Sequence, residues 1–458
     1  MRIASGTVNV RRLIWLGWAL LLAGRMHGQA TSPGNALPLA PQATVVNLTP
    51  QPGYFTEPAI AIDPNDPQHI AAAFQDTAHA GFSADGGATW AVATGTASTR
   101  FRVSGDVSIA WDTHGHAILC YMAFDKLGTF NYWGHNSSEN GLFVRRSLDG
   151  GRTWEAQDIP IIQHADDPAV PWEDKPYLVA DDSHSRYGGN LYVGWTRWTL
   201  TDSEIWFARS ADNGLTWSKP IEIDRHPGLP RDDNGALEGF AGTVAPDGTL
   251  YVTWAADGWL QFTVSHDGGR TFSIPRNVVK TAPIMFQVQD VARSNGFPQI
   301  GVDARPARKP RLYLTWSDYR NGDTDVFVSA SSDLGRTWGP AVRVNNDPLH
   351  DGADQFFQWM AVDPIDGSVN VLFYDRRDDP RNRDATVTLA RSTDDGRSFR
   401  NYAWTTQGFN PQRAFLGDYT GIAARDGRVY GIWTVKPAGT GPRSSIIQIG
   451  RADFGQTR

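Results

Sequence analysis

Short apolar runs bounded by Gly, Asp or Asn recur along this chain, with almost no helical periodicity. They follow one scheme seven times: an apolar strand, a turn, and a second strand rich in Tyr, Val and Trp, residues typical of β-strands. The second strands are predicted over His69–Asp76, His116–Phe124, Asn190–Trp198, Thr249–Asp257, Arg311–Tyr319, Val369–Arg377 and Val429–Lys436. The pattern predicts an all-β protein built from repeated sheets.

A second repeat, Ser-x-Asp-x-Gly-x-Thr-aromatic or a close variant, follows six of these strand pairs. Its copies, the Asp boxes, begin at Ser83, Ser147, Ser210, Ser265, Ser331 and Ser392. A spacing of about 60 residues fits one four-stranded propeller blade. We interpret the box as a tight turn in which glycine takes a positive φ and Asp accepts backbone N–H hydrogen bonds. The six box aspartates are therefore expected to be structural.

The seventh repeat, Asp418–Phe454, has a third strand over Ser444–Arg451 but no box. A spare strand at Ala43–Thr49 could supply its missing fourth strand and leave the sheet ring without a free edge. We therefore predict a β-propeller of seven blades, closed by the N-terminal strand, with six blades as the alternative. No linker divides residues 31–458, so we expect one propeller domain.

Residues 1–30 have the features of a signal peptide. Arg11 and Arg12 precede the apolar run Leu13–Gly24, and Gly28–Ala30 offers small residues for cleavage. The run is too short to span a bilayer. We expect a secreted or periplasmic protein without a membrane span.

The net charge is −7, and removal of the first 30 residues, which contain four arginines and no acid, makes it −11. This acidity argues against a nucleic-acid partner. Cys120 is the only cysteine, so an intrachain disulfide is excluded, and no Cys/His zinc pattern occurs. No metal or other cofactor is predicted, although the oxygen-rich loops 318–325 and 375–384 could hold calcium. We expect a monomer.

Ionisable residues gather where a propeller opens its central channel. The loop that leads into each first strand and the loop after each second strand open on one face, whereas the boxes lie on the other. The residues predicted before or within the start of the first strands are Glu57, Asp106, Asp174, Lys175, Glu238, Asn295, Asp354, Asp418 and Tyr419. Those after the second strands are Asp76, Asp125, Arg197, Asp257, Asp318, Arg320, Tyr374, Asp375, Arg376, Arg377 and Lys436. Such a gathering of charge predicts a ligand site at this mouth.

Carboxyl groups beside arginines suit glycan chemistry. An oxocarbenium-like transition state needs a nearby negative group, the leaving oxygen needs a proton donor, and an acidic sugar needs guanidinium donors. A carbohydrate is therefore the expected substrate or ligand.

The Asp boxes resemble those of the sialidase superfamily, whose propellers have six blades. The resemblance implies that Tyr419, in Gly417–Ile422, is a nucleophile and that Glu238 is the base that activates it. It further implies that Asp125 is the acid. Arg102, in a degenerate Arg-Ile-Pro motif, would bind substrate together with Arg320 or Arg376, between which no motif decides, and Asp106 and Asp418 would lie beside them.

The sequence departs from the sialidase pattern in two places. Ser104 replaces the proline of the first motif, and Thr253-Trp254 stands where the second arginine is expected. We therefore expect a sialidase-like glycoside hydrolase acting on an acidic oligo- or polysaccharide rather than a true sialidase. The alternatives are a polysaccharide lyase and a non-catalytic propeller that binds glycan, protein or a cation.

Overall fold

The computed structural model describes residues 36–75, 77–96, 98–125, 139–165, 171–232, 235–284, 287–306 and 308–455. Residues Leu37–Arg458 form one compact unit. The described part of the chain contains 28 β-strands and no α-helix. The predicted signal peptide, residues 1–30, and Asp76 lie outside the described residues.

The strands form four-stranded antiparallel sheets, numbered here as blades. Blade 1 contains β2 (Thr56–Ile62), β3 (Ile70–Gln75), β4 (His79–Ser83) and β5 (Ala91–Val92). Blade 2 contains β6 (Val103–Trp111), β7 (Ala117–Phe124), β8 (Glu139–Ser147) and β9 (Ile159–Ala165). Blade 3 contains β10 (Trp172–Ala180), β11 (Leu191–Trp198), β12 (Ser203–Ser210) and β13 (Ile221–Glu222). Blade 4 contains β14 (Glu238–Val244), β15 (Leu250–Ala256), β16 (Trp259–Ser265) and β17 (Arg276–Lys280).

The remaining strands build three further blades. Blade 5 contains β18 (Gln299–Asp303), β19 (Arg311–Asp318), β20 (Asp325–Ser331) and β21 (Val342–Arg343). Blade 6 contains β22 (Gln355–Val362), β23 (Val369–Asp375), β24 (Thr386–Ser392) and β25 (Arg400–Ala403). Blade 7 contains β26 (Gly421–Arg425), β27 (Arg428–Val435), β28 (Ile446–Asp453) and β1 (Thr44–Asn47).

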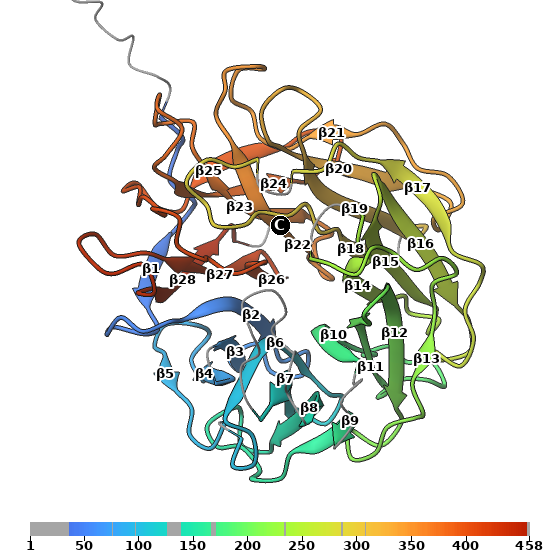
Figure 1. The fold of residues 1–458 in the computed structure, drawn as a ribbon. Coiled ribbons are helices and arrows are strands. Elements are labelled where there is room, and N and C mark those ends of the chain that lie inside the picture. Colours follow the sequence, from blue (N-terminus) through green and yellow to red (C-terminus); the bar gives the residue numbers. More distant parts are fainter. Residues whose placement is uncertain are drawn as a thin grey trace, which may run out of the picture. The chain divides into compact units, whose positions relative to one another are not determined.

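The blades close into a ring. The first strands contact one another in the order β2, β6, β10, β14, β18, β22, β26 and back to β2, and they are innermost in Figure 1. Blade 7 closes as the sequence predicted, because β1 pairs antiparallel with β28, Thr44 opposite Arg451. The prediction of seven blades is confirmed, and the six-bladed alternative is wrong.

Each Asp box forms the predicted turn between a third and a fourth strand. In the second box, Asp149 Oδ1 accepts a hydrogen bond from Thr153 N at 2.9 Å, and Ser147 Oγ accepts one from Gly151 N at 2.9 Å. The same bonds recur in the other five boxes. The box aspartates therefore serve the turn, on the face opposite the starts of the first strands.

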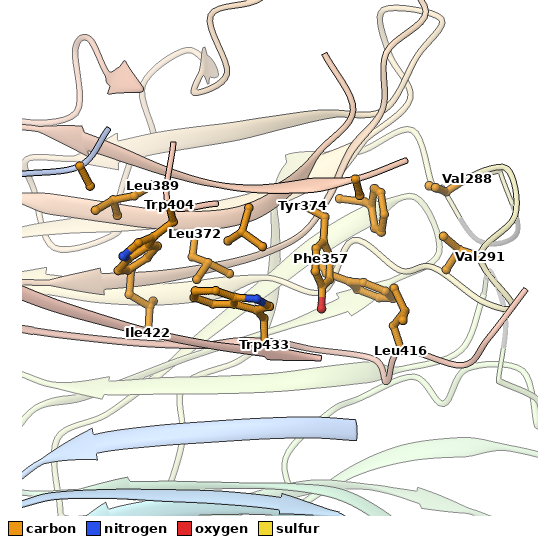
Figure 2. Packing of buried hydrophobic residues seen from close by; sticks show 14 of the residues in the cluster. Val288, Val291, Phe357, Leu372, Tyr374, Leu389, Trp404, Leu416, Ile422 and Trp433 are labelled. Atoms are coloured by element: carbon orange, nitrogen blue, oxygen red, sulfur yellow. The ribbon is translucent and has the colours of Figure 1, made fainter. Parts of the chain in front are cut away.

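Tyrosine and tryptophan three residues apart on a second strand point to opposite sides of their blade. In β27, Tyr430 packs against blade 1 and Trp433 packs against blade 6. Figure 2 shows Trp433 with Trp404, Leu372 and Ile422 between blades 6 and 7. The spacing recurs in β11, β15 and β19, so apolar packing between blades holds the ring together.

Among the described residues, no helix is long and apolar enough to cross a membrane.

Candidate functional site

Five of the seven first strands carry a β-bulge near their start. The register shifts between Thr56 and Ala59, Gly105 and Ser108, Asp174 and Tyr177, Glu238 and Ala241, and Phe356 and Trp359. The bulged residues have positive φ: Glu57 52°, Asp106 41°, Lys175 51°, Gly239 71° and Phe357 51°. A left-handed backbone costs about 1 kcal/mol or more for a residue other than glycine. Backbone strain thus coincides with the charged positions at the mouth.

The bulges and adjacent loops bring charged groups from several blades together in one cluster. We call this group the mouth cluster; it comprises Glu57, Asp106, Asp174, Lys175, Asp232, Glu238, Arg293, Asn295 and Asp418. Its members from the first strands are buried; Asp106, for example, is 5% exposed. Six carboxyl groups therefore share two cations, so the cluster must hold protons or retain excess negative charge.

Lys175 is the electrostatic centre of the mouth cluster. Its Nζ lies 3.0 Å from Glu238 Oε1, 3.1 Å from Asp174 Oδ2, 3.4 Å from Asp418 Oδ2 and 3.5 Å from Asp232 Oδ2. Although burial alone would lower it, these carboxylates raise the pKa of Lys175 well above its usual value. Lys175 therefore stays protonated and neutralises part of the cluster.

Arg293 adds the second cation. Its Nε donates to Asp418 Oδ1 at 2.8 Å, and its other nitrogens pair with Asp418 and Asp232. Asn295 Nδ2 also donates to the Asp418 carbonyl at 2.9 Å. Asp418 is thus held by two neighbouring side chains as well as by Lys175.

Glu57 and Asp106 form a hydrogen-bonded carboxyl pair. Burial raises the pKa of Glu57 to about 7, despite its bond to Asp106. Burial, followed by the charge of Glu57, raises the pKa of Asp106 well above its usual value, so Asp106 holds the proton. Asp106 also contacts the carboxyl group of Asp174, so its single proton is shared between Glu57 and Asp174.

Asp174 remains ionised beside this pair. Burial opposes its ionisation, but Lys175 and hydrogen bonds from Asp106 and Trp198 lower its pKa to about 2. Trp198 Nε1 donates to Asp174 Oδ2 at 2.9 Å. Neighbouring carboxyl groups whose pKa values are driven apart are characteristic of acid–base sites.

The backbone before Asp418 also fits Glu57 closely. The Asp418 N–H donates to Glu57 Oε1 at 3.0 Å. The preceding Gly417 has φ 98°, and a Cβ there would lie 2.5 Å from Glu57 Cγ. Only glycine allows this approach without displacement, so Gly417 helps to hold the Glu57 carboxylate.

Tyr419 lies beside the cluster but does not pair with Glu238. Its hydroxyl donates to the Val107 carbonyl at 3.3 Å, and its ring packs on Trp359 at 5.5 Å between centroids. Burial, then the charge of Glu57, raises the pKa of Tyr419 well above the usual value. The predicted activation of Tyr419 needs a hydrogen bond from its hydroxyl to Glu238, but Glu238 faces Lys175 instead. Because its pKa is raised, Tyr419 stays a neutral phenol at neutral pH.

A cavity of about 90 Å³ lies in the channel next to the cluster. Lys175, Tyr177, Phe240, Trp359 and Tyr419 are among its lining residues. Burial raises the pKa of Glu238, at the start of β14, to about 7, opposed by Lys175. Of the mouth cluster, Lys175 lines this aromatic-walled cavity, and Gly239, which follows Glu238, also belongs to its wall.

Four predicted site residues have other surroundings. Asp125 follows β7 and accepts a hydrogen bond from Glu139 N at 3.3 Å. Arg320 is paired with Asp318, and Arg376 is fully buried, 3.8 Å from Asp354. Arg102 is exposed and has no ion pair among the described residues. The structure therefore brings Glu238, Asp106, Asp418 and Tyr419 together, without these four.

Two members of the cluster were missed by the sequence reasoning. Arg293 and Asp232 lie on loops that precede β18 and β14. Arg293 stands two residues before Asn295, a position that the repeat had singled out, and this proximity was the available signal. Asp232 had no such signal, because it lies six residues before Glu238, away from the position that the repeat had singled out.

Several carboxylate oxygens of the two candidate calcium loops accept hydrogen bonds from side chains of the protein. Asp325 Oδ1 accepts from Arg343 and Asn345 at 2.6 Å, and Asp375 accepts from Arg377 at 2.7 Å. Within the described ranges, no group of three or more His, Cys, Asp or Glu residues has a geometry suited to a metal ion.

No family model matches the sequence, and no curated protein matches it significantly. Similar solved structures include a protein of unknown function from Dyadobacter fermentans, with 14% identity and a TM-score of 0.47, covering 89% of this chain and 97% of that one. A Hadza microbial sialidase has 18% identity and a TM-score of 0.48, covering 77% and 66%. An alpha-L-arabinofuranosidase from Fusarium graminearum has 12% identity and a TM-score of 0.46, covering 76% and 92%. Sialidases thus occur among the similar structures, as the Asp boxes led us to expect; at these identities the likeness concerns the fold alone.

Proposed function

We propose that this protein cleaves glycosidic bonds at the mouth cluster. The observation that carries the proposal is the Glu57–Asp106 carboxyl pair, with raised pKa values, beside the ionised Asp174. Cleavage of a glycoside needs a proton for the leaving oxygen and a carboxylate near the anomeric carbon. Asp106 would donate the proton, and Asp174 would stabilise the positive charge.

Tyr419 would hydrogen-bond to the sugar as a neutral hydroxyl rather than act as a nucleophile. Its raised pKa disfavours the phenolate, and the carboxylates around it add to that cost. Water would supply the hydroxyl group at the anomeric carbon, and its proton would pass to an ionised carboxylate such as Glu57.

We expect an uncharged sugar at the cleaved bond. Arg293, Arg320 and Arg376 each lie within ion-pair distance of a carboxylate of the protein. An acidic sugar in the cluster would have to displace these partners and would meet an excess of carboxyl groups. Any acidic unit of the substrate would therefore bind elsewhere.

The test is a screen of the purified protein against neutral and acidic oligo- and polysaccharides, measuring reducing ends and unsaturated products. Asp106→Asn should lower kcat by about 100-fold or more, the usual effect of losing a general acid. Tyr419→Phe should retain most of the activity. Asp257→Asn, at an exposed acid on the same face, is the matched control and should behave as wild type.

Undiminished turnover in Asp106→Asn and in Glu57→Gln would rule out this assignment. Unsaturated products would instead identify a lyase. A loss of turnover in Tyr419→Phe as large as that in Asp106→Asn would instead support Tyr419 as a nucleophile, as in sialidases.

A second function, a non-catalytic glycan-binding propeller, is favoured by one observation. Lys175 and Arg293 already neutralise Glu238 and Asp418, and these carboxyl groups are 1–2% exposed. Glycan binding without turnover on any substrate would support this function.

A further inference from the structure

A groove of about 590 Å³ lies between blades 6 and 7, apart from the mouth cluster. It is bounded by the segment after β25 and the segment after β27. Both segments lie on the face where the mouth cluster opens, and residues 405–417 connect the groove to Asp418. Its volume is in the range of small-molecule sites.

Lys436, which lines this groove, is an exception among the buried cations. Five Lys or Arg side chains are buried in the described part of the chain: Arg145, Lys175, Arg376, Arg391 and Lys436. The first four have a carboxylate of the protein within 4.0 Å. Lys436, at 2% exposure, has one hydrogen-bond partner among the described residues, the Thr440 carbonyl, which accepts from Nζ at 3.0 Å.

A buried ammonium without a negative partner is costly, and its two remaining N–H donors are strong. Asp384 also lines the groove, but its Oδ1 accepts from Asn410 Nδ2 at 2.8 Å and its Oδ2 lies 3.9 Å from Arg381. It is not within ion-pair distance of Lys436. The charge on Lys436 therefore has no partner within the described protein and calls for an anion from outside.

The other polar side chains of the groove suit a polyhydroxylated molecule. Gln407 and Gln412 offer amide donors and acceptors, whereas the amides of Asn410 and Gln448 already hydrogen-bond within the protein. Trp404 and Trp433 contribute buried walls. Amides beside aromatic surface can satisfy sugar hydroxyls and the apolar face of a sugar ring. A lone inorganic anion would leave most of the groove unfilled.

We propose that the groove between blades 6 and 7 binds an acidic sugar, with Lys436 pairing its carboxylate or sulfate group. This site goes beyond the proposed cleavage and does not depend on it. If both hold, the substrate is a polymer with an acidic unit at the groove and an uncharged unit at the mouth cluster.

The test is calorimetric titration of the full protein with an oligouronate, a sulfated oligosaccharide, a neutral oligosaccharide of the same length, and sodium sulfate alone. We expect one or both acidic oligosaccharides to bind, more weakly as salt rises, and the neutral one to bind at least about tenfold more weakly. Which acid binds identifies the anionic group.

Lys436→Met keeps the bulk of the side chain and should lower the affinity for the acidic oligosaccharide at least about tenfold, as expected for loss of a charge-assisted hydrogen bond. Lys219→Met, at an exposed lysine of blade 3, is the control and should bind as wild type. If Lys436→Met fails to fold, Gln407→Ala combined with Gln412→Ala, both at exposed positions, should weaken binding instead.

Equal affinity for acidic and neutral oligosaccharides would overturn the proposal, and so would unchanged affinity in both groove variants. Binding of sodium sulfate without binding of either acidic oligosaccharide, or no binding of any of them, would also overturn it. Asp106→Asn should bind the acidic sugar as wild type does. Binding without cleavage in the wild type would then refute the proposed function while leaving the groove site intact.

Discussion

The ammonium of Lys175 and the carboxylate of Glu238 lie 3.0 Å apart, although β10 and β14 belong to different blades. Lys175 stands on a left-handed bulge and Glu238 directly precedes one. The pair therefore joins two blades through residues whose backbones are held in unusual conformations.

Lys175→Met should destabilise the protein by about 3–5 kcal/mol, because it leaves buried carboxylates without their cation. Urea unfolding at neutral pH measures the change. Adding Glu238→Gln should recover part of the loss, since one uncompensated charge is removed. Additive losses in the double variant would show that the pair is not coupled.

Glu57→Gln should become more stable relative to wild type as the pH rises. The folded-state pKa of Glu57 is about 7, above its usual 4.5, so its contribution is complete below pH 4.5 and is lost as the pH rises through 7. Between pH 4 and pH 8, the difference in unfolding free energy between variant and wild type should shift by about 3 kcal/mol in favour of the variant.

Thermal unfolding at a series of pH values would record this trend. A pH-independent difference between Glu57→Gln and wild type would show that the carboxyl group is not buried as described.

The Asp boxes should give the opposite pH dependence. Hydrogen bonds from Thr lower the pKa of Asp85 and Asp333 to about 2, so their stabilisation is present above the usual value near 4 and is lost toward pH 2. Stability should therefore fall between pH 4 and pH 2. In a protein carrying Asn in place of all six box aspartates, this acid-induced loss should shrink.

Leu48→Ala should lower the unfolding free energy by about 2–4 kcal/mol. Leu48 follows β1, is 4% exposed, and packs against Ile60, Ile70 and Phe74 of blade 1. Val45→Ala, at a residue of β1 that is 36% exposed, is the control and should change stability little. Equal effects of the two substitutions would argue against the ring closure described here.

Cys120 should resist thiol reagents in the folded protein. The residue is buried, and burial raises its pKa well above the usual value, so almost no thiolate forms. Labelling with iodoacetamide should appear only in denaturant, at the transition seen by fluorescence. Rapid labelling under native conditions would contradict the packing of blade 2.

The repeats made the fold predictable, because the strands and turns follow one another in the same order in the sequence of each blade. The predicted second strands agree with β3, β7, β11, β15, β19, β23 and β27 within one or two residues at each end. The same register placed Glu57, Asp106, Asp174, Lys175, Glu238 and Asp418 at the mouth. The positions of residues that the repeat fixes within a blade could therefore be predicted from the sequence.

Which side chains of the mouth cluster contact one another could not be predicted from the repeat. Whether Glu238 faces Tyr419 or Lys175 depends on bulges at Lys175 and Gly239, and Pro176, which follows Lys175, gives no sign of a left-handed residue before it. Arg320 and Arg376 looked available for a substrate, but Asp318 and Asp354 lie beside them in the fold. Such choices depend on side-chain partners from distant loops, which no local pattern records.

The pairing of Thr44 with Arg451 has a practical consequence for handling the molecule. Strand β1 starts, and β28 ends, at the box side of blade 7, away from the mouth cluster. A tether attached before β1 or after β28 would leave from that side. Immobilised in this way on a sensor or a resin, the propeller would present its charged mouth and the Lys436 groove to the solution.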